Sequence, residues 1–253
     1  MAPRRFLNGI SDLSSAAPLG NFNLLDPRKY SALFLDFAGP LLAAATVNNT
    51  TTVEAGYSVL ASANGTASVS VDAGALDGCL KFVTTAADNE SCLFQTPSGG
   101  FTMTSGKKFF MEAKFEITHT AGVIAQNELF IGLASFQSTT NFFATNGLTR
   151  TFDDGIGWIT FDADANIDLI CGENDVYDTA TQIATYATAT WYTLSLYYDG
   201  TNITTWVNGA PSATMTPAQI PVSVVGPTIY MKTGEAKVHT MLTDYLLVVK
   251  ERS

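Results

Sequence analysis

The acidic stretch that begins at Asp162 has the residue types and spacing of a calcium-binding loop. Its oxygen-bearing side chains occupy positions 1, 3, 5, 7 and 12 of such a loop; they are Asp162, Asp164, Asn166, Asp168 and Glu173. The position of the sharp turn, where the loop needs glycine, holds Ile167, and the flanking segments have the pattern of strands rather than helices. We therefore prefer a hairpin turn in which Asp and Asn make local hydrogen bonds, and we predict no metal and no other cofactor.

Acid–base and nucleophilic chemistry would need other groupings. Glycosidases use two carboxylates about 5 to 10 Å apart across a cleft. Glu112 and Glu116 share a strand face, but Lys114 lies between them, which is typical of a solvated charge ladder. The two histidines, His119 and His239, have no spacing to a cysteine or serine that indicates a catalytic set. The sequence thus predicts that the chain is not an enzyme.

Four aromatic residues gather in a loop-like stretch rich in Asn and Thr, and they are Phe136, Phe142, Phe143 and Phe152. Exposed aromatic rings beside amides can stack on and orient a glycan. The same rings could dock on a neighbouring subunit, or they could cover one end of a protein core. The sequence leaves these three interpretations open.

Composition excludes several classes of protein. Of 253 residues, 46% are hydrophobic and only 14% are charged, so Thr, Ser, Asn and Ala must form much of the surface. The net charge of −10 argues against nucleic-acid binding, which Lys and Arg would lead. No apolar run is long enough for a membrane span or a signal peptide. Cys79, Cys92 and Cys171 are predicted to be buried free thiols, although Cys79 and Cys92 could pair.

The elements that must position these residues are strands. From 107 to 118, apolar residues alternate with charged ones, which predicts a strand with one buried face. Further short runs are separated by turn residues up to 251, and this spacing indicates an all-β sandwich or jelly roll. We predict an extended arm over 1–30 and a sandwich over 31–253. Within the sandwich, 31–105 would hold extra hairpins at Asn64-Gly65 and Asp88-Asn89, and 106–253 the main strands.

The stretch WYTLSLYYDGTNITTWVNGA, residues 191–210, resembles the paired strands of concanavalin A-like and laminin G-like sandwiches. Asp199-Gly200 and Asn208-Gly209 would form tight turns. Core positions are expected for the large apolar side chains of the two strands, which are Trp191, Leu194, Leu196 and Trp206. The resemblance covers about residues 105–252 and implies a concanavalin A-like jelly-roll sandwich.

A second resemblance concerns the N-terminus. RRFLNGI, residues 4–10, and PLGNFNLLDPRKYSALFLDF, 18–37, resemble the opening of structural proteins of marine tailed bacteriophages. The resemblance implies a virion component, assembled in the host cytoplasm, and we favour a capsid decoration or cement protein on the capsid surface. Its partners would be the major capsid protein and further copies of itself, as a homo-oligomer that could be a trimer. The arm would make these contacts through Arg4, Arg5, Phe6, Leu7, Phe22, Arg28 and Tyr30.

The alternative to decoration is a glycan-binding domain of a head or tail fibre that attaches the particle to a host surface. An image of the virion that locates the protein would distinguish the two hypotheses. Binding to any sugar would favour the glycan-binding domain.

Overall fold

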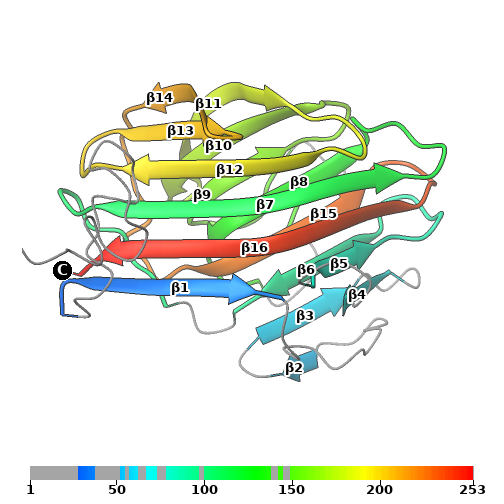
Figure 1. Cartoon of the computed structure of the whole chain (residues 1–253), viewed down its shortest axis with the longest axis horizontal. Helices are drawn as coiled ribbons and strands as arrows, with labels where there is room; N and C mark the ends of the chain where they lie inside the picture. The colour runs from blue at the N-terminus through cyan, green and yellow to red at the C-terminus, as the bar shows by residue number, and fades with distance from the viewer. Residues whose placement is uncertain are drawn as a thin grey trace, which may run out of the picture.

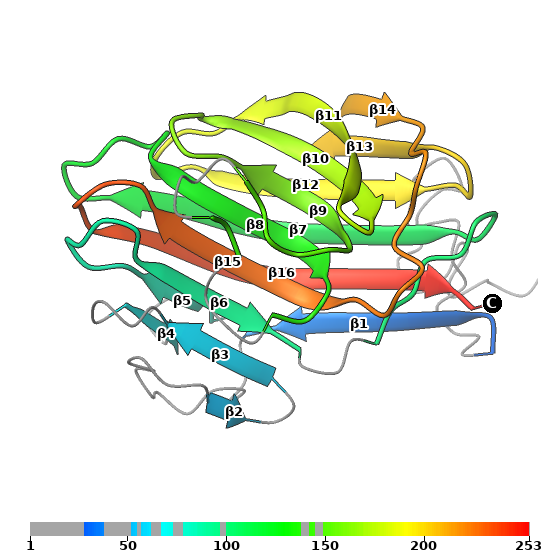
Figure 2. The same cartoon turned by 180° about the vertical axis from the view of Figure 1, so that it is seen from behind.

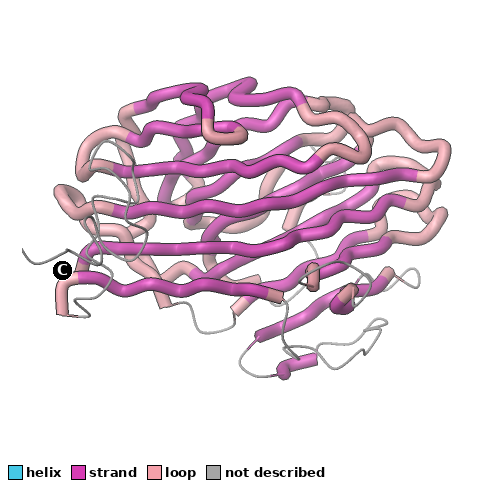
Figure 3. The backbone as a smooth tube through the Cα atoms, in the orientation of Figure 1, coloured by secondary structure: helices cyan, strands magenta, loops and turns pink. Residues whose placement is uncertain are grey.

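The structure is a computed structural model of the chain that describes residues 28–37, 52–54, 57–61, 67–72, 78–96, 100–137, 142–144 and 149–252. For 52–54 and 57–61 it describes the backbone alone. Sixteen strands lie in these ranges (Figure 3). No helix occurs among the described residues, and so none there is long and apolar enough to cross a membrane.

Eight strands form the first antiparallel sheet, sheet A, which faces the viewer in Figure 1. They are β1 (Tyr30–Asp36), β4 (Ser68–Val71), β5 (Leu80–Val83), β7 (Phe109–His119), β12 (Trp191–Tyr198), β13 (Ile203–Val207), β14 (Ala210–Met215) and β16 (His239–Glu251). Their order is β14-β13-β12-β7-β16-β5-β4, and β1 pairs with the C-terminal half of β16. Sheet A is therefore built from both ends of the described chain.

The second antiparallel sheet, sheet B, lies behind sheet A and faces the viewer in Figure 2. Its strands are β2 (Thr52–Glu54), β3 (Tyr57–Ala61), β6 (Ser91–Gln95), β8 (Asn127–Ala134), β9 (Gly155–Thr160), β10 (Asn166–Glu173), β11 (Val176–Thr185) and β15 (Gly226–Thr233). Their order is β11-β10-β9-β8-β15-β6-β3-β2. The predicted all-β sandwich is confirmed.

The core lies between the two sheets and follows the predicted alternation. On β7 the inward residues are all buried, and they are Phe109, Met111, Ala113, Phe115 and Ile117. Side chains from sheet B, among them Ile131 and Trp158, join the same cluster. Every residue of β8, β9 and β15 is buried, so the centre of sheet B is covered on both of its faces.

Two predicted turns of the main sandwich are confirmed. Asp199 Oδ1 accepts hydrogen bonds from the backbone N–H groups of Thr201 and Asn202, and this closes the turn between β12 and β13. At the next turn Asn208 and Gly209 have φ of 50° and 78°. Two successive positive φ angles match the twist of the flanking strands in a two-residue hairpin, here β13 and β14.

The two hairpins predicted within 31–105 are wrong. β3 pairs with β2 and β6 in sheet B, whereas β4 pairs with β5 in sheet A, so β3 and β4 are not partners; Asn64 and Gly65 themselves lie outside the described residues. Likewise β5 lies in sheet A and β6 in sheet B, so the segment with Asp88-Asn89 crosses between the sheets. Alternating runs joined by turn residues do not report which sheet each strand joins. All three cysteines are buried and free.

Candidate functional site

The central part of the outer face of sheet B is covered by a segment of the chain itself. Phe142, Phe143 and Phe152, from the segment between β8 and β9, are buried and pack on Phe130 and Tyr230 of the sheet. The rings of Phe142 and Phe152 stack with centroids 4.3 Å apart, and Phe142 stacks on Tyr230 at 5.1 Å. These three rings are therefore closed to a ligand. Of the four aromatic residues considered for glycan or subunit contact, Phe136 alone is exposed.

A buried ion pair fastens this segment to sheet B. Lys232 Nζ lies 2.9 Å from Glu128 Oε2 and donates a hydrogen bond to the carbonyl oxygen of Ala144 at 3.2 Å. Burial raises the pKa of Glu128 to about 7, although the hydrogen bond and charge of Lys232 act in the opposite direction. Because Lys232 bridges the sheet and the segment, the pair holds the aromatic cluster in place.

The outer face of sheet A presents a row of paired residues that crosses five strands. Trp206 on β13 lies opposite Ser195 on β12, which lies opposite Glu112 on β7. Glu112 in turn faces Leu247 on β16, and Leu247 faces Phe34 on β1. Strands stand about 4.8 Å apart, so the row spans about 19 Å. It ends in two aromatic rings, of which Phe34 is 57% exposed.

Glu112 is the polar centre of this row. Ser195 Oγ donates a hydrogen bond to Glu112 Oε2 at 2.7 Å, and the hydroxyl of Tyr245 donates to Glu112 Oε1 at 2.8 Å. Tyr245 also packs against Phe34, with ring centroids 5.8 Å apart. Burial raises the pKa of the Tyr245 hydroxyl, and the nearby charge of Glu112 raises it further. Tyr245 therefore remains a hydrogen-bond donor. The carboxylate is thus held in a fixed orientation on a half-buried surface.

A third aromatic ring lies beside the row. Trp191, 37% exposed, stands directly opposite Glu116, and Lys114 Nζ lies 5.0 Å from the centroid of its ring. Lys114 also pairs with Asp244 at 2.6 Å. The predictions that Trp191 and Trp206 lie in the core are wrong, because both side chains point to the outer face, whereas Leu194 and Leu196 are buried as predicted.

The other end of the same face is closed. Phe110 and Val249 are buried there, and Tyr30, Tyr197 and Leu247 pack against them. Tyr30, which was predicted to contact a partner, is thus the first residue of β1 and part of this cluster. Its carbonyl oxygen accepts a hydrogen bond from Arg252. Arg28 is exposed in the turn before β1. Arg4, Arg5, Phe6, Leu7 and Phe22 lie outside the described residues.

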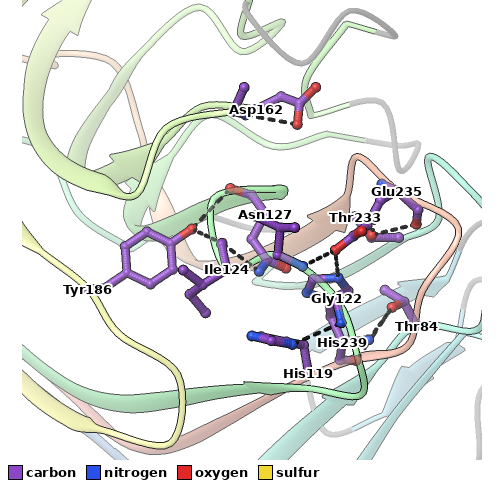
Figure 4. Close-up of polar contacts among 12 residues, drawn as sticks. Thr84, His119, Gly122, Ile124, Asn127, Asp162, Tyr186, Thr233, Glu235 and His239 are labelled. Carbon is purple, nitrogen blue, oxygen red and sulfur yellow. Dashed lines mark hydrogen bonds and ion pairs between the residues drawn. The ribbon is translucent and has the colours of Figure 1, made fainter.

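The two histidines, which sequence reasoning left apart, meet at one end of the sandwich (Figure 4). His119 and His239 are paired residues of β7 and β16. His239 Nε2 lies 3.0 Å from Glu235 Oε1, which also accepts a hydrogen bond from the backbone N–H of Val123. Gly122 donates to His119 Nδ1 at 3.1 Å. Burial lowers the pKa of His239. We interpret the cluster as a junction between loops, since its polar groups are largely turned toward one another.

Gly122 packs closely against two side chains at this junction. A Cβ at Gly122 would lie 2.5 Å from Glu235 Oε1 and 3.0 Å from His239 Nε2. On the other side of the junction Tyr186 donates from its hydroxyl to the carbonyl oxygen of Ile124 at 2.8 Å, and Asn127 Nδ2 donates to the same oxygen at 3.0 Å (Figure 4). No sequence spacing could have revealed the cluster, because it depends on the register of β7 against β16.

The side chains with the spacing of a calcium-binding loop lie along the hairpin of β9 and β10. A hairpin was the interpretation preferred from the sequence. Asp164 Oδ1 accepts a hydrogen bond from the backbone N–H of Asn166, and Asp168 Oδ1 accepts one from that of Gln182. Glu173 lies at the far end of β10. Within the described ranges, no group of three or more His, Cys, Asp or Glu side chains could hold a metal ion.

Comparison with known proteins identifies the fold. No protein-family model matches the chain, and no curated protein matches its sequence. Among solved structures, the endo-1,3-beta-glucanase from Streptomyces sioyaensis has a TM-score of 0.57 at 15% identity, over 88% of this chain and 97% of that one. The carbohydrate recognition domain of Emp47p has 0.56 at 12%, over 88% and 97%. The endo-beta-1,4-glucuronan lyase from the fungus Trichoderma reesei has 0.50 at 12%, over 74% and 89%.

The chain therefore has a concanavalin A-like jelly-roll sandwich, as predicted. The prediction that it is not an enzyme is contradicted, because a glucanase and a lyase are among the structures that share this fold. That prediction rested on the spacing of carboxylates along the sequence. In a sandwich, neighbouring side chains come from strands far apart in the chain, as the row from Trp206 to Phe34 illustrates, so linear spacing was the wrong criterion.

Proposed function

We propose that the chain binds carbohydrate on the outer face of sheet A, along the row from Trp206 to Phe34. The observation that carries the proposal is a fixed carboxylate, Glu112, set between aromatic rings on an open sheet surface. Aromatic rings offer apolar faces on which the C–H faces of a sugar ring can stack, and a few placed polar groups then orient its hydroxyls.

The composition and the other face support this choice. A surface poor in charge costs little to desolvate, and charged residues are only 14% of the chain. The central part of the outer face of sheet B, in contrast, is covered by Phe142, Phe143 and Phe152. Likeness to a carbohydrate recognition domain is consistent with the proposal at the level of the fold.

A glycan array probed with the wild-type chain tests the proposal, followed by titration of the bound glycans into variants. Trp206→Ala should weaken binding by about tenfold or more, as expected when an aromatic anchor is removed. Phe136→Ala is the control, because Phe136 is an exposed aromatic residue that follows β8 of sheet B. Equal loss in both variants, or an array without any bound glycan, would contradict the proposal.

The same glycans should be incubated with the chain and assayed for cleavage products. Release of products would show that the face, or another part of this fold, acts on the glycan after binding it. Binding without products would indicate a recognition domain.

The finer form of the proposal is attachment of a virion to a glycan on the host surface, as part of a head or tail fibre. It rests on the resemblance of residues 4–10 and 18–37 to phage structural proteins. Capsid decoration, and partnership with the major capsid protein, remain predictions from that resemblance, and no described feature of the fold adds support to them.

A further inference from the structure

We propose that this face selects neutral or amine-bearing glycan chains and rejects chains rich in uronate, with Glu112 as the residue that determines the selection. The inference rests on the proposed function and specifies its ligand class. It is carried by the charges that surround the aromatic row, and by the hydrogen-bonding capacity that Glu112 retains.

Acidic side chains dominate the area around the row. Glu112 lies at its centre, Glu116 stands opposite Trp191, and Asp36 stands opposite Tyr245. Two lysines lie nearby on the same sheet, and both have carboxylate partners: Lys114 pairs with Asp244 at 2.6 Å and Lys81 with Asp72 at 3.6 Å. Among these side chains the carboxylates outnumber the ammonium groups, so a uronate on the ligand would meet a net negative charge, whereas an ammonium group would meet its complement.

Glu112 can accept more hydrogen bonds than the two described for it. A carboxylate has about four acceptor sites over its two oxygens, and Ser195 and Tyr245 each donate to a different oxygen. The remaining acceptor capacity suits the hydroxyl of a neutral sugar or the ammonium of an amino sugar. It cannot bind a second carboxylate without a proton or a cation between the two.

The length of the row indicates a chain rather than a single sugar. Trp206 and Phe34 are separated by four strand spacings, or about 19 Å. Trp191 lies off this line, next to Glu116. A ligand that contacts both ends of the row must therefore be an oligosaccharide.

Three β-1,4-linked oligomers of equal length, made of glucose, glucosamine or glucuronate, differ in the charge of one substituent and form a matched probe set. They are titrated into the wild-type chain at low and at high salt, alongside an array that contains neutral, amine-bearing and uronate-bearing glycans. We expect neutral or amine-bearing ligands to bind, any amine preference to shrink with added salt, and uronate ligands to bind at least tenfold more weakly.

Glu112→Gln tests the assigned residue, since glutamine keeps the size of the side chain and removes its charge. The variant should narrow the preference against uronate by about tenfold while its melting temperature stays close to that of the wild-type chain. Glu173→Gln, which removes a carboxylate from β10 of sheet B, is the control and should leave the preference unchanged. If Glu112→Gln fails to fold, Glu116→Gln, which lies on the same face opposite Trp191, should narrow the preference in the same direction.

Failure of the inference can be told from failure of the proposed function. If uronate ligands bind as tightly as neutral ones, or if the preference survives the charge-removing variants, the inference is overturned while carbohydrate binding stands. If no glycan binds on the array or in titration, the proposed function itself is contradicted.

Discussion

His119 and His239 face each other on β7 and β16, with ring centroids 5.7 Å apart, although 120 positions separate them in the sequence. The side chain of His239 is completely buried, and Glu235 is its charged partner. Burial disfavours the protonated imidazole, which lowers the pKa of His239. The folded chain therefore favours the neutral form of His239 at this junction of loops.

This dependence predicts an effect of pH on stability. Below about pH 6.5 the unfolded chain binds a proton at His239 that the folded chain resists, so the free energy of unfolding should fall as the pH falls. Glu128, whose pKa is raised to about 7, contributes a slope of the opposite sign. The measurement is thus the difference in unfolding free energy between wild type and His239→Gln at pH 7.5 and 5.5. A difference that does not change with pH would contradict this account.

The buried pair of Lys232 and Glu128 predicts a large effect of a single substitution. Lys232→Met should cost about 3 to 5 kcal/mol in urea unfolding at pH 8, because it leaves a buried carboxylate without a partner. The double variant Lys232→Met/Glu128→Leu should recover much of this loss. Lys81→Met, which removes the more exposed pair with Asp72, should cost less than about 1 kcal/mol. Equal losses at the two sites would argue against a buried pair.

The aromatic cluster over sheet B predicts that replacing Phe142 destabilises the chain far more than replacing Phe136. Phe142→Ala should destabilise the chain by about 3 to 5 kcal/mol, because it opens a cavity among Phe130, Phe152 and Tyr230. Phe136→Ala should change the unfolding free energy by no more than about 0.5 kcal/mol, since its ring is already exposed. A small effect of Phe142→Ala in urea titration would show that the outer face of sheet B is open.

We predict that calcium does not change the stability of the chain through the hairpin that holds Asp162, Asp164 and Asp168. Asp164 already accepts a hydrogen bond from the backbone of Asn166 in the same turn, and Asp168 accepts one from the backbone of Gln182 on β11. The melting temperature should therefore be the same with a chelator and with added Ca²⁺. A clear rise in melting temperature with Ca²⁺, lost in Asp164→Ala, would restore the metal interpretation.

Much of the main sandwich could be predicted, because alternation fixes which face of a strand is buried. The inward residues of β7, and the turn at Asn208-Gly209, follow from local patterns. Trp206 was placed in the core on hydrophobicity alone. Its position in the alternation argued otherwise, because the inward residues of β13 are Ile203 and Thr205, which are buried.

The candidate site could not be predicted from the sequence, because it depends on the register in which distant strands pair. The pairing of Glu112 with Ser195 on one side and Leu247 on the other joins residues from three distant parts of the chain. The assignment of β4 and β5 to sheet A and of β6 to sheet B was missed for a related reason. A turn sequence such as Asp88-Asn89 can connect strands of two different sheets as well as the two strands of a hairpin.

The central claim is that carbohydrate binds on the outer face of sheet A, and tryptophan fluorescence during a glycan titration tests it most directly. Of the three tryptophans, Trp158 is buried in the core, while Trp191 and Trp206 lie on this face. We predict that a glycan bound on the array changes the emission of the wild-type chain. The Trp191→Phe/Trp206→Phe variant, which keeps aromatic rings, should still bind but lose the signal. A bound glycan that leaves wild-type emission unchanged, or a signal that persists in the double variant, would contradict the account.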